Sequence, residues 1–235
     1  MKILVVTRSI CQELYELSGS LLRPLNLTRI PLRDTDALGY FIELSTLDAD
    51  WIINIDEDAF VTCPEHITSL LKFMNNEGYD VAGMPDGGVF HHRFHNPLVP
   101  NAFFTIHRME FLKKNIEAGL FNPQSIKGHI HQAEYETKTP HHLIRGKYSF
   151  DNFEPYYDYF FWLHRYNARF LYLDAIHWNR DPTSTVLLSH EKKPFLIHCW
   201  YARAYAEQQK RFLDAWQFAK DIQEQRKDKS SYNMQ

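Results

Sequence analysis

Two carboxylates stand at the end of an apolar run in this sequence, at a spacing that suits a metal ion. The run 51–55 (Trp-Ile-Ile-Asn-Ile) is followed directly by Asp56, Glu57 and Asp58. Side chains at i and i+2 of a strand point to the same face, so Asp56 and Asp58 can converge on one ligand while Glu57 points away. Hard oxygen ligands of this kind suit Mg²⁺ or Mn²⁺ carrying substrate phosphates. We therefore expect an enzyme that acts on a phosphorylated, nucleotide-linked substrate.

Alternating strands and helices are predicted to position these carboxylates. The predicted strands are 3–7, 27–32, 51–55, 79–84, 102–108, 169–175 and 194–200. The predicted helices are 12–22, 34–47 with Asp34 or Thr35 as its cap, 63–76, 109–119, 156–166 and 201–227, followed by a polar, frayed tail from Asp228. This order is typical of an α/β fold with a mainly parallel central sheet flanked by helices. The irregular stretch 121–153 is interpreted as a functional loop or lid, or alternatively as a partly disordered insertion.

Composition limits the class of protein. The chain has 235 residues, 44% of them hydrophobic and 15% aromatic, which fits one large domain. The net charge of −3, with dispersed Lys and Arg, argues against nucleic-acid binding. Three widely spaced cysteines form neither a disulfide framework nor a Cys-rich zinc site, which favours a reducing cytosol. No apolar run approaches the ~20 residues of a membrane helix. We expect a cytoplasmic protein, with peripheral membrane contact left open.

The placement of these motifs resembles the GT-A glycosyltransferases. The strand 2–7 matches that family's first nucleotide-binding strand, and 38–44 (Leu-Gly-Tyr-Phe-Ile-Glu-Leu) looks like the helix before its metal strand. The strand ending in Asp56-Glu57-Asp58 corresponds to its Asp-x-Asp motif. The segment 157–165 is similar to its Glu-Asp-x-x-x-x-x-x-Arg helix, with Tyr157 in place of the Glu. The resemblance covers most of the chain and implies a GT-A-like fold.

The resemblance also implies roles for individual residues. Asp58 would ligate Mn²⁺ or Mg²⁺ directly, and Asp56 would reach the metal through water or hold the ribose. His198, at the end of a late apolar run, corresponds to a further metal ligand in several GT-A enzymes. Asp158 would be the catalytic base of an inverting reaction, with Glu154 as its rival. The alternatives are a solvated acidic turn at 56–58, a core histidine at 198, and carboxylates that stabilise a helix start at 154 and 158.

Further residues are candidates for contacting the nucleotide-sugar donor. They stand at predicted strand ends, caps and turns, where open α/β sheets bind ligands. In this group Asp86 would bind sugar hydroxyls, Gly87 would let the backbone approach the substrate, and Arg203 would clamp phosphate. The alternatives are an ordinary turn at 86–87 and a solvated charge at Arg203. The donor-contacting candidates are Thr7, Arg8, Arg33, Asp34, Asp56, Glu57, Asp86, Gly87 and Arg203.

The sequence thus predicts a metal-dependent glycosyltransferase of a single domain. Residues 1–100 would form the nucleotide-sugar-binding half, 101–200 the acceptor and catalytic half, 201–227 a C-terminal helix and 228–235 a polar tail. The donor would be a nucleotide diphosphate sugar, with UDP favoured, and the acceptor a hydroxyl of a glycan or lipid-linked glycan. Two rivals remain open: a phosphohydrolase of the haloacid-dehalogenase type, and a non-catalytic nucleotide- or glycan-binding module.

Overall fold

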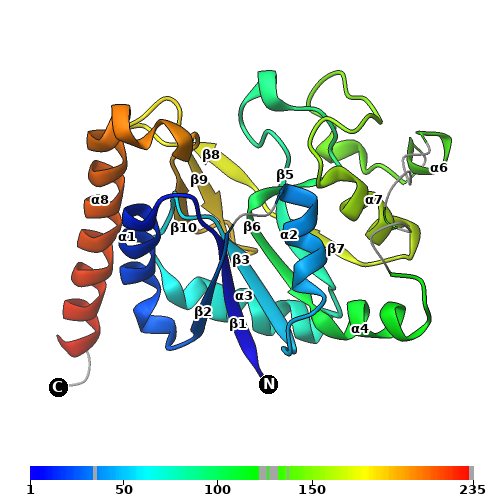
Figure 1. The fold of residues 1–235 in the computed structure, drawn as a ribbon. Coiled ribbons are helices and arrows are strands. Elements are labelled where there is room, and N and C mark those ends of the chain that lie inside the picture. The colour runs from blue at the N-terminus through cyan, green and yellow to red at the C-terminus, as the bar shows by residue number, and fades with distance from the viewer. Residues whose placement is uncertain (34–35, 122–125, 127–131, 137, 233–235) are drawn as a thin grey trace.

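Six strands form a central sheet in the computed structural model, which describes residues 1–33, 36–121, 126, 132–136 and 138–232 (Figure 1). Across the sheet they lie in the order β2 (Thr28–Leu32), β1 (Ile3–Arg8), β3 (Trp51–Ile55), β6 (Pro100–Arg108), β5 (Val81–Pro85), β7 (Phe170–Tyr172). β6 runs antiparallel to both of its neighbours, and every other pairing in this sheet is parallel. The mainly parallel sheet predicted from the sequence is therefore confirmed.

A second, antiparallel sheet was not predicted. Its strands lie in the order β4 (Ala59–Val61), β10 (Pro194–His198), β9 (Thr185–Leu188), β8 (Ala175–His177). The predicted strand 169–175 is in fact two elements: β7 ends at Tyr172 in the central sheet, and β8 begins at Ala175 in the second sheet. β4 follows Asp58 directly, so the acidic turn connects the two sheets.

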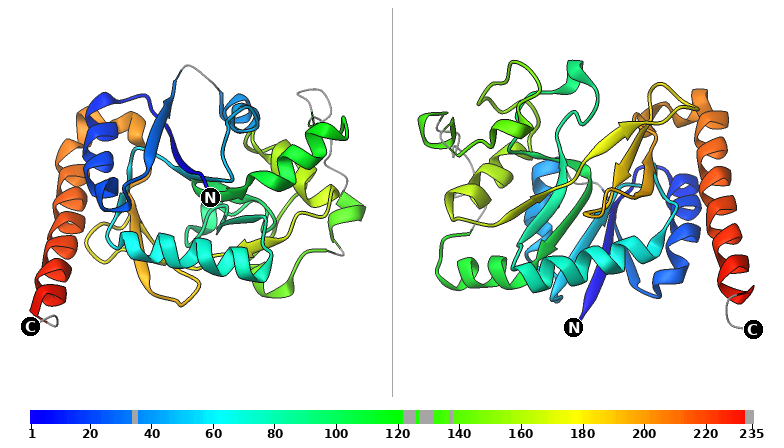
Figure 2. Two further views of the ribbon diagram at one scale, coloured as in Figure 1. Left: turned by 90° about the horizontal axis from the view of Figure 1, so that it is seen from below. Right: turned by 180° about the vertical axis from the view of Figure 1, so that it is seen from behind.

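Helices cover both faces of the central sheet. The helices in the described part of the chain are α1 (Gln12–Leu22), α2 (Ala37–Leu44), α3 (Pro64–Glu77), α4 (Met109–Glu117), α6 (Gln132–Glu136), α7 (Tyr157–Arg165) and α8 (Tyr205–Tyr232). α3 crosses one face, and α2 and α7 lie on the other (Figures 1 and 2). α1 packs beside α8, next to the second sheet.

Local chemistry explains where the helices begin and end. α3 starts at Pro64, whose missing N–H costs nothing in the first turn, and stops at Gly78, which adopts the left-handed conformation with φ 73°. α2 is capped by Asp36, whose carboxylate accepts a hydrogen bond from the Gly39 N–H at 2.6 Å. The predicted caps Asp34 and Thr35 lie outside the described residues. The helix predicted at 201–227 is observed as α8, which begins at Tyr205 after a 3₁₀ turn and continues to Tyr232, while the fraying of the tail stays a prediction.

Alternating side chains of the central strands fill two cores. Leu4, Val6 and Ile52 face the core that contains α2 and α7, whereas Val5 and Ile53 face the core that contains α3. Strands buried on both faces are what a parallel sheet requires. α7 is buried almost all round, from Tyr157 to Leu163. No helix in the described part of the chain is long and apolar enough to cross a membrane.

His107 in the core predicts sensitivity to acid. Burial lowers the pKa of its imidazole to about 3, and its ring nitrogens contact Thr105 Oγ1 at 2.9 Å and the Tyr159 hydroxyl at 3.3 Å. An unfolded histidine binds a proton below pH 6.5, but folded His107 does not until about pH 3. The free energy of unfolding should therefore decrease as the pH is lowered from 6.5 toward 3, by at most about 1.4 kcal/mol per pH unit for this proton.

Urea unfolding between pH 7 and pH 4.5 tests this expectation. The His107→Gln variant keeps a polar side chain but has no proton to bind, so its stability should fall less steeply with pH than that of the wild type. His142→Gln, which changes an exposed histidine, is the matched control and should keep the wild-type slope. Equal slopes for wild type and His107→Gln would contradict the prediction.

Candidate active site

Two adjacent parallel strands place an ion pair at one edge of the central sheet. Arg8 is the last residue of β1, and Asp56 follows the last residue of β3, which pairs with β1. Arg8 Nη2 and Asp56 Oδ2 are 3.3 Å apart. The carboxyl ends of parallel strands are where open α/β sheets bind ligands. The structure therefore brings two of the predicted donor-contacting residues together at the expected edge.

The second sheet brings Asp58 to His198. β4 begins directly after Asp58, β10 ends at His198, and these strands are paired so that His198 lies opposite Ala59. The Cys199 N–H donates to the Asp58 carbonyl at 3.0 Å, which fixes the register. As a result, His198 Nε2 lies 3.3 Å from Asp58 Oδ1, and both side chains are buried. Two predicted metal ligands, 140 residues apart in the chain, are thus neighbours.

Burial and mutual repulsion give the two aspartates different affinities for protons. The pKa of Asp56 is raised to about 6, chiefly by burial and also by the nearby Asp58, with Arg8 and His198 opposing the rise. Burial also acts to raise the pKa of Asp58, but His198, a backbone hydrogen bond and Arg8 together hold this pKa below its usual range. Near neutral pH both carboxylates are therefore charged, with one arginine beside them, which is an arrangement that attracts a cation.

The residues at this edge fit a divalent cation. Nε2 of His198 and Oδ1 of Asp58 are further apart than the ~2.8 Å of a charged N–H···O bond. Their separation is close to the ~3.0 Å between two ligands at right angles around Mg²⁺. Nδ1 of His198 is buried and has no hydrogen-bond partner in the described structure, as is common where an ion or water belongs.

The predicted triad of Asp56, Asp58 and His198 is only partly assembled. Asp56 is turned to Arg8, and within the described ranges no three His, Cys, Asp or Glu side chains are arranged to hold a metal. Mg²⁺ in nucleotide sites takes only one or two carboxylates and completes its shell with phosphates and water. The structure places one buried carboxylate, that of Asp58, beside His198 at this position, and a second, that of Asp56, on the Arg8 side.

Glu57 is turned to the start of α1. Its carboxylate accepts hydrogen bonds from Ser9 Oγ at 2.8 Å and from the backbone N–H groups of Ile10 and Cys11 at 3.0–3.2 Å. A carboxylate at a helix N-terminus satisfies groups that have no partner inside the helix. These contacts give Glu57 a structural role, and its predicted contact with the donor stays a prediction.

Thr7 is also engaged within the protein. Its hydroxyl accepts a hydrogen bond from Arg29 Nε at 2.8 Å, and the guanidinium of Arg29 donates to Ser18 Oγ and stacks on the ring of Tyr15. Burial lowers the pKa of Arg29 to about 10. Arg29 thereby connects Thr7, next to Arg8 at the end of β1, to helix α1.

The turn after β5 is closed by its own side chains. The carboxylate of Asp86 is buried and accepts hydrogen bonds from the Gly87 N–H, Asn101 Nδ2 and the Tyr157 hydroxyl. Gly87 has φ 80°, and a Cβ there would lie 2.6 Å from the backbone of Arg93 and Phe94. In this arrangement Asp86 and Gly87 hold the loop against helix α7 and the 3₁₀ turn 91–93, and their predicted donor contacts remain untested.

The two candidates for the catalytic base have different neighbours. Glu154 lies 3.2 Å from Arg93, whose guanidinium stacks 4.9 Å from the centre of the Trp200 ring. That ring lies 4.6 Å from the ring of His198, so Glu154 is connected to the metal candidates through two side chains. Asp158, in the first turn of α7, accepts a hydrogen bond from Asn152 at 3.1 Å.

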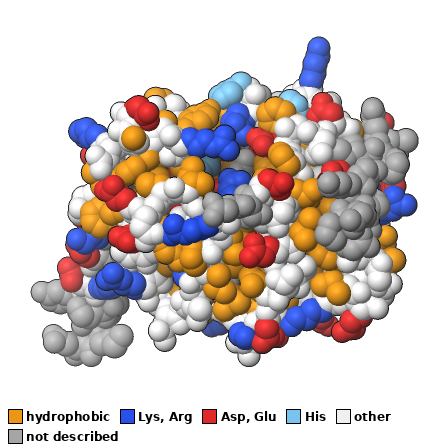
Figure 3. All heavy atoms as spheres, viewed as in Figure 1, with side chains coloured by type: hydrophobic (Ala, Val, Ile, Leu, Met, Phe, Trp, Pro, Cys, Tyr) orange, Lys and Arg blue, Asp and Glu red, His pale blue; other side chains and the backbone are white. Residues whose placement is uncertain are grey.

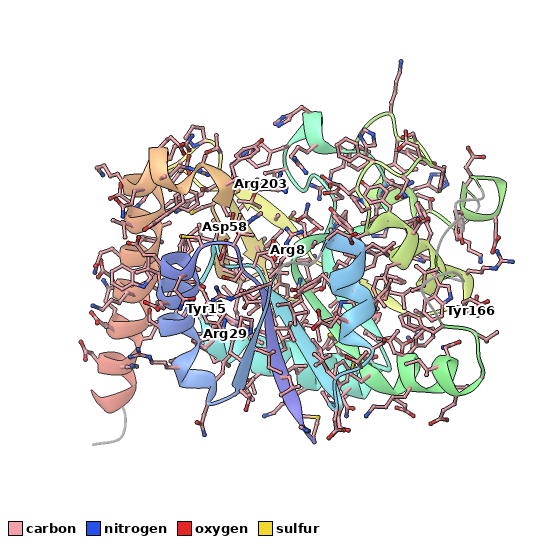
Figure 4. The ribbon with its side chains drawn as sticks, in the orientation of Figure 1. Arg8, Tyr15, Arg29, Asp58, Tyr166 and Arg203 are labelled. Atoms are coloured by element: carbon pink, nitrogen blue, oxygen red, sulfur yellow. The ribbon has the colours of Figure 1, made fainter. Side chains whose placement is uncertain are left out.

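The remaining predicted residues lie nearer the surface. Arg203 is exposed in a 3₁₀ turn after β10, and Figure 4 shows it at the same end of the central sheet as Arg8 and Asp58. On this side of the molecule Figure 3 shows a hollow with Lys or Arg side chains on its rim. Arg33 is hydrogen bonded to Gln12. Asp34 lies outside the described residues.

Three residues near this site escaped the sequence analysis. Arg93 and Trp200 connect Glu154 to His198, and Tyr156 lies close enough to Arg8 for each to shift the pKa of the other. Trp200 and the following Tyr201 both have positive φ, at 49° and 65°, which is unusual for large side chains and frequent at functional sites. Of these three residues, only Trp200 had a signal in the sequence: its position at the end of an apolar run could have indicated that it lies near the site.

Pockets of substantial volume lie elsewhere on the described surface. One of about 670 Å³ lies between α8 and residues 178–181, and one of about 630 Å³ lies between α3 and α8. A third, of about 490 Å³, borders Met1 and α4. None of the three is lined by Asp56, Asp58 or His198. The candidate site is therefore defined by its chemistry rather than by the volume of a pocket.

Comparisons with known proteins give only distant likenesses. No family model and no curated protein matches the chain. A197 from STIV is similar with 18% identity and a TM-score of 0.40, over 83% of this chain and 94% of that one. The mannosyltransferase PcManGT from Pyrobaculum calidifontis, solved with GDP-Man and Mn²⁺, has 10% identity and a TM-score of 0.36, over 48% and 45%.

A third solved structure, the CMP:2-keto-3-deoxy-manno-octonic acid synthetase in complex with CTP, has 13% identity and a TM-score of 0.33, over 59% of this chain and 86% of that one. With TM-scores below 0.5, these likenesses establish neither the fold family nor the function of this chain.

Proposed function

We propose that this chain is a metal-dependent glycosyltransferase of GT-A type, which moves a sugar from a nucleotide diphosphate donor to a hydroxyl of a glycan or lipid-linked acceptor. The observation that carries the proposal is the buried contact between Asp58 and His198, 3.3 Å apart, beside the Arg8–Asp56 pair. It offers ligands for one cation and a guanidinium for phosphate at the edge where α/β sheets bind nucleotides.

The protein's own groups divide the work of binding the donor. Asp58 and His198 would hold Mn²⁺ or Mg²⁺, which when bound neutralises charge on the leaving diphosphate. Arg8 can pair with a diphosphate oxygen once Asp56 turns toward the cation. Arg203, which is exposed, can supply a second guanidinium to the diphosphate. Asp56 binds a proton with a pKa of about 6, so cation and proton compete for it in mildly acidic solution.

The transfer step needs a base for the acceptor hydroxyl. As the hydroxyl oxygen bonds to the anomeric carbon, its proton passes to a carboxylate, and the bond from that carbon to the diphosphate breaks with its electron pair going to the diphosphate. Glu154 and Asp158 are the two carboxylates proposed for this role. Attack from the face opposite the diphosphate inverts the configuration at the anomeric carbon.

A panel of nucleotide sugars tests the proposed function. UDP-, GDP- and CMP-linked sugars would each be incubated with the protein and Mn²⁺, and release of the nucleotide would be measured with and without EDTA. We expect one donor to be turned over in Mn²⁺, and EDTA to abolish the release. Parallel calorimetry with the free nucleotides and Mn²⁺ reports binding without turnover.

The same assays separate the rival functions. Tight nucleotide binding without any release of product from the panel, with acceptors present, would indicate a binding module. Magnesium-dependent hydrolysis of p-nitrophenyl phosphate, in the absence of transfer, would indicate a phosphohydrolase. Release that is unaffected by EDTA would contradict the metal-dependent mechanism.

A further inference from the structure

One aromatic ring beside the two candidate bases is both fixed and exposed. Phe153 is 41% exposed, although it is flanked by residues that all have partners. One face of its ring stacks on the imidazole of His95, with ring centres 3.6 Å apart and an angle of 23° between the planes. Its edge meets the ring of Tyr157. The stack on His95 supports the ring from one side, and the exposed part of the ring forms an apolar platform.

Polar residues flank Phe153 in the sequence. Asp151 lies 3.7 Å from His95 Nε2, Asn152 donates to the carboxylate of Asp158, and Glu154 pairs with Arg93. Four consecutive residues thus supply an aromatic face between hydrogen-bonding groups. This combination suits a pyranose, whose C–H face is apolar and whose hydroxyls project around the rim.

The platform lies where an acceptor would be needed. Phe153 directly precedes Glu154, and Glu154 is connected through Arg93 and Trp200 to His198. Phe153 is therefore next in the chain to one candidate base, Glu154, and its other neighbour, Asn152, donates a hydrogen bond to the second candidate, Asp158. Arg93 and Trp200 stand between Glu154 and the cation candidate His198 in this series of contacts.

We propose that Phe153, backed by His95, is the platform that binds a pyranose ring of the acceptor. That the bound sugar is an acceptor rests on the proposed function. The inference deepens that function by naming the acceptor class, which is a glycan that presents a pyranose with an accessible C–H face. An acyclic polyol or the hydroxyl of an amino-acid side chain has no such face and would not be selected.

Binding can be measured without nucleotide or metal, so this inference and the proposed function can fail separately. The probes are methyl β-D-glucopyranoside, methyl β-D-galactopyranoside and methyl α-D-mannopyranoside, followed by saturation-transfer NMR and titration. Glucitol, which has similar hydroxyls but no ring, is the control ligand. We expect at least one pyranoside to bind with a dissociation constant in the millimolar range, and glucitol not to bind.

Variants assign that binding to the ring. Phe153→Ala should raise the dissociation constant about fivefold or more, and Phe153→Trp should restore it. Ile176→Ala removes an apolar side chain that is 49% exposed on β8 and should leave pyranoside binding unchanged. Circular dichroism melts confirm that each variant is folded. Two results would overturn the proposal. One is equal pyranoside affinity in wild type and Phe153→Ala. The other is no binding of any pyranoside by the wild type at ligand concentrations of about tens of millimolar, 50-fold the protein concentration and above.

Discussion

The Asp58→Asn variant is expected to lose about 100- to 1,000-fold in kcat/KM for nucleotide-sugar turnover, as is typical when one group that stabilises developing charge is removed. Asparagine has the size of aspartate but lacks its charge, so the cation loses its anionic ligand next to His198. The fold should persist, because removing this carboxylate also relieves its repulsion with Asp56. Initial rates at several Mn²⁺ concentrations measure the effect, and the loss should be accompanied by weaker Mn²⁺ activation.

A matched substitution controls for a general effect of charge. Asp48→Asn makes the same chemical change on a side chain that is 85% exposed and forms surface pairs with Lys2 and Lys113. Such pairs contribute little, so this variant should keep wild-type activity and Mn²⁺ dependence. If Asp58→Asn instead keeps full activity with unchanged Mn²⁺ activation, the site at Asp58 and His198 is not the one that drives turnover.

The limits of the sequence prediction are clearest where the chain leaves one sheet for another. The strand 51–55 was predicted with the bounds that the structure has, because a short, mostly apolar run bounded by charges has few alternatives. The run 169–175 looked equally continuous, yet the chain crosses from β7 to β8 at Leu173 and Asp174. Sheet membership depends on partners distant in the sequence, and periodicity does not encode them.

The same argument applies to the candidate site. The Asp58–His198 contact exists because β4 pairs with β10, and β4 is a three-residue strand that the sequence analysis did not detect. Three adjacent acids at 56–58 suggested that Glu57 would point away from the metal, but not where it would point. Its partners begin at Ser9, 48 residues earlier, and they lie beside it only because β1 and β3 are neighbours.

Glu57→Gln is expected to lower the free energy of unfolding by about 2 kcal/mol. The carboxylate accepts from three donors at the start of α1, and glutamine offers one carbonyl oxygen and places an NH₂ group against the remaining donors. Burial raises the pKa of Glu57, so loss of charge costs less here than loss of acceptors. A change of this size lowers Tm by roughly 4–8 °C in a protein of this length. Urea and thermal unfolding of the metal-free protein measure it.

Glu57→Gln also separates structure from ligand binding within the acidic turn. Glu16→Gln, on the exposed side of α1, should change stability by less than about 0.5 kcal/mol. If Glu57 acts through α1, Mn²⁺ with the nucleotide should raise the Tm of Glu57→Gln by as much as it raises that of the wild type, since a ligand that binds only the folded state adds its own stabilisation. In Asp58→Asn that added stabilisation should be absent. A Glu57→Gln protein that keeps wild-type stability but loses the ligand-induced rise in Tm would instead place Glu57 among the donor-binding residues.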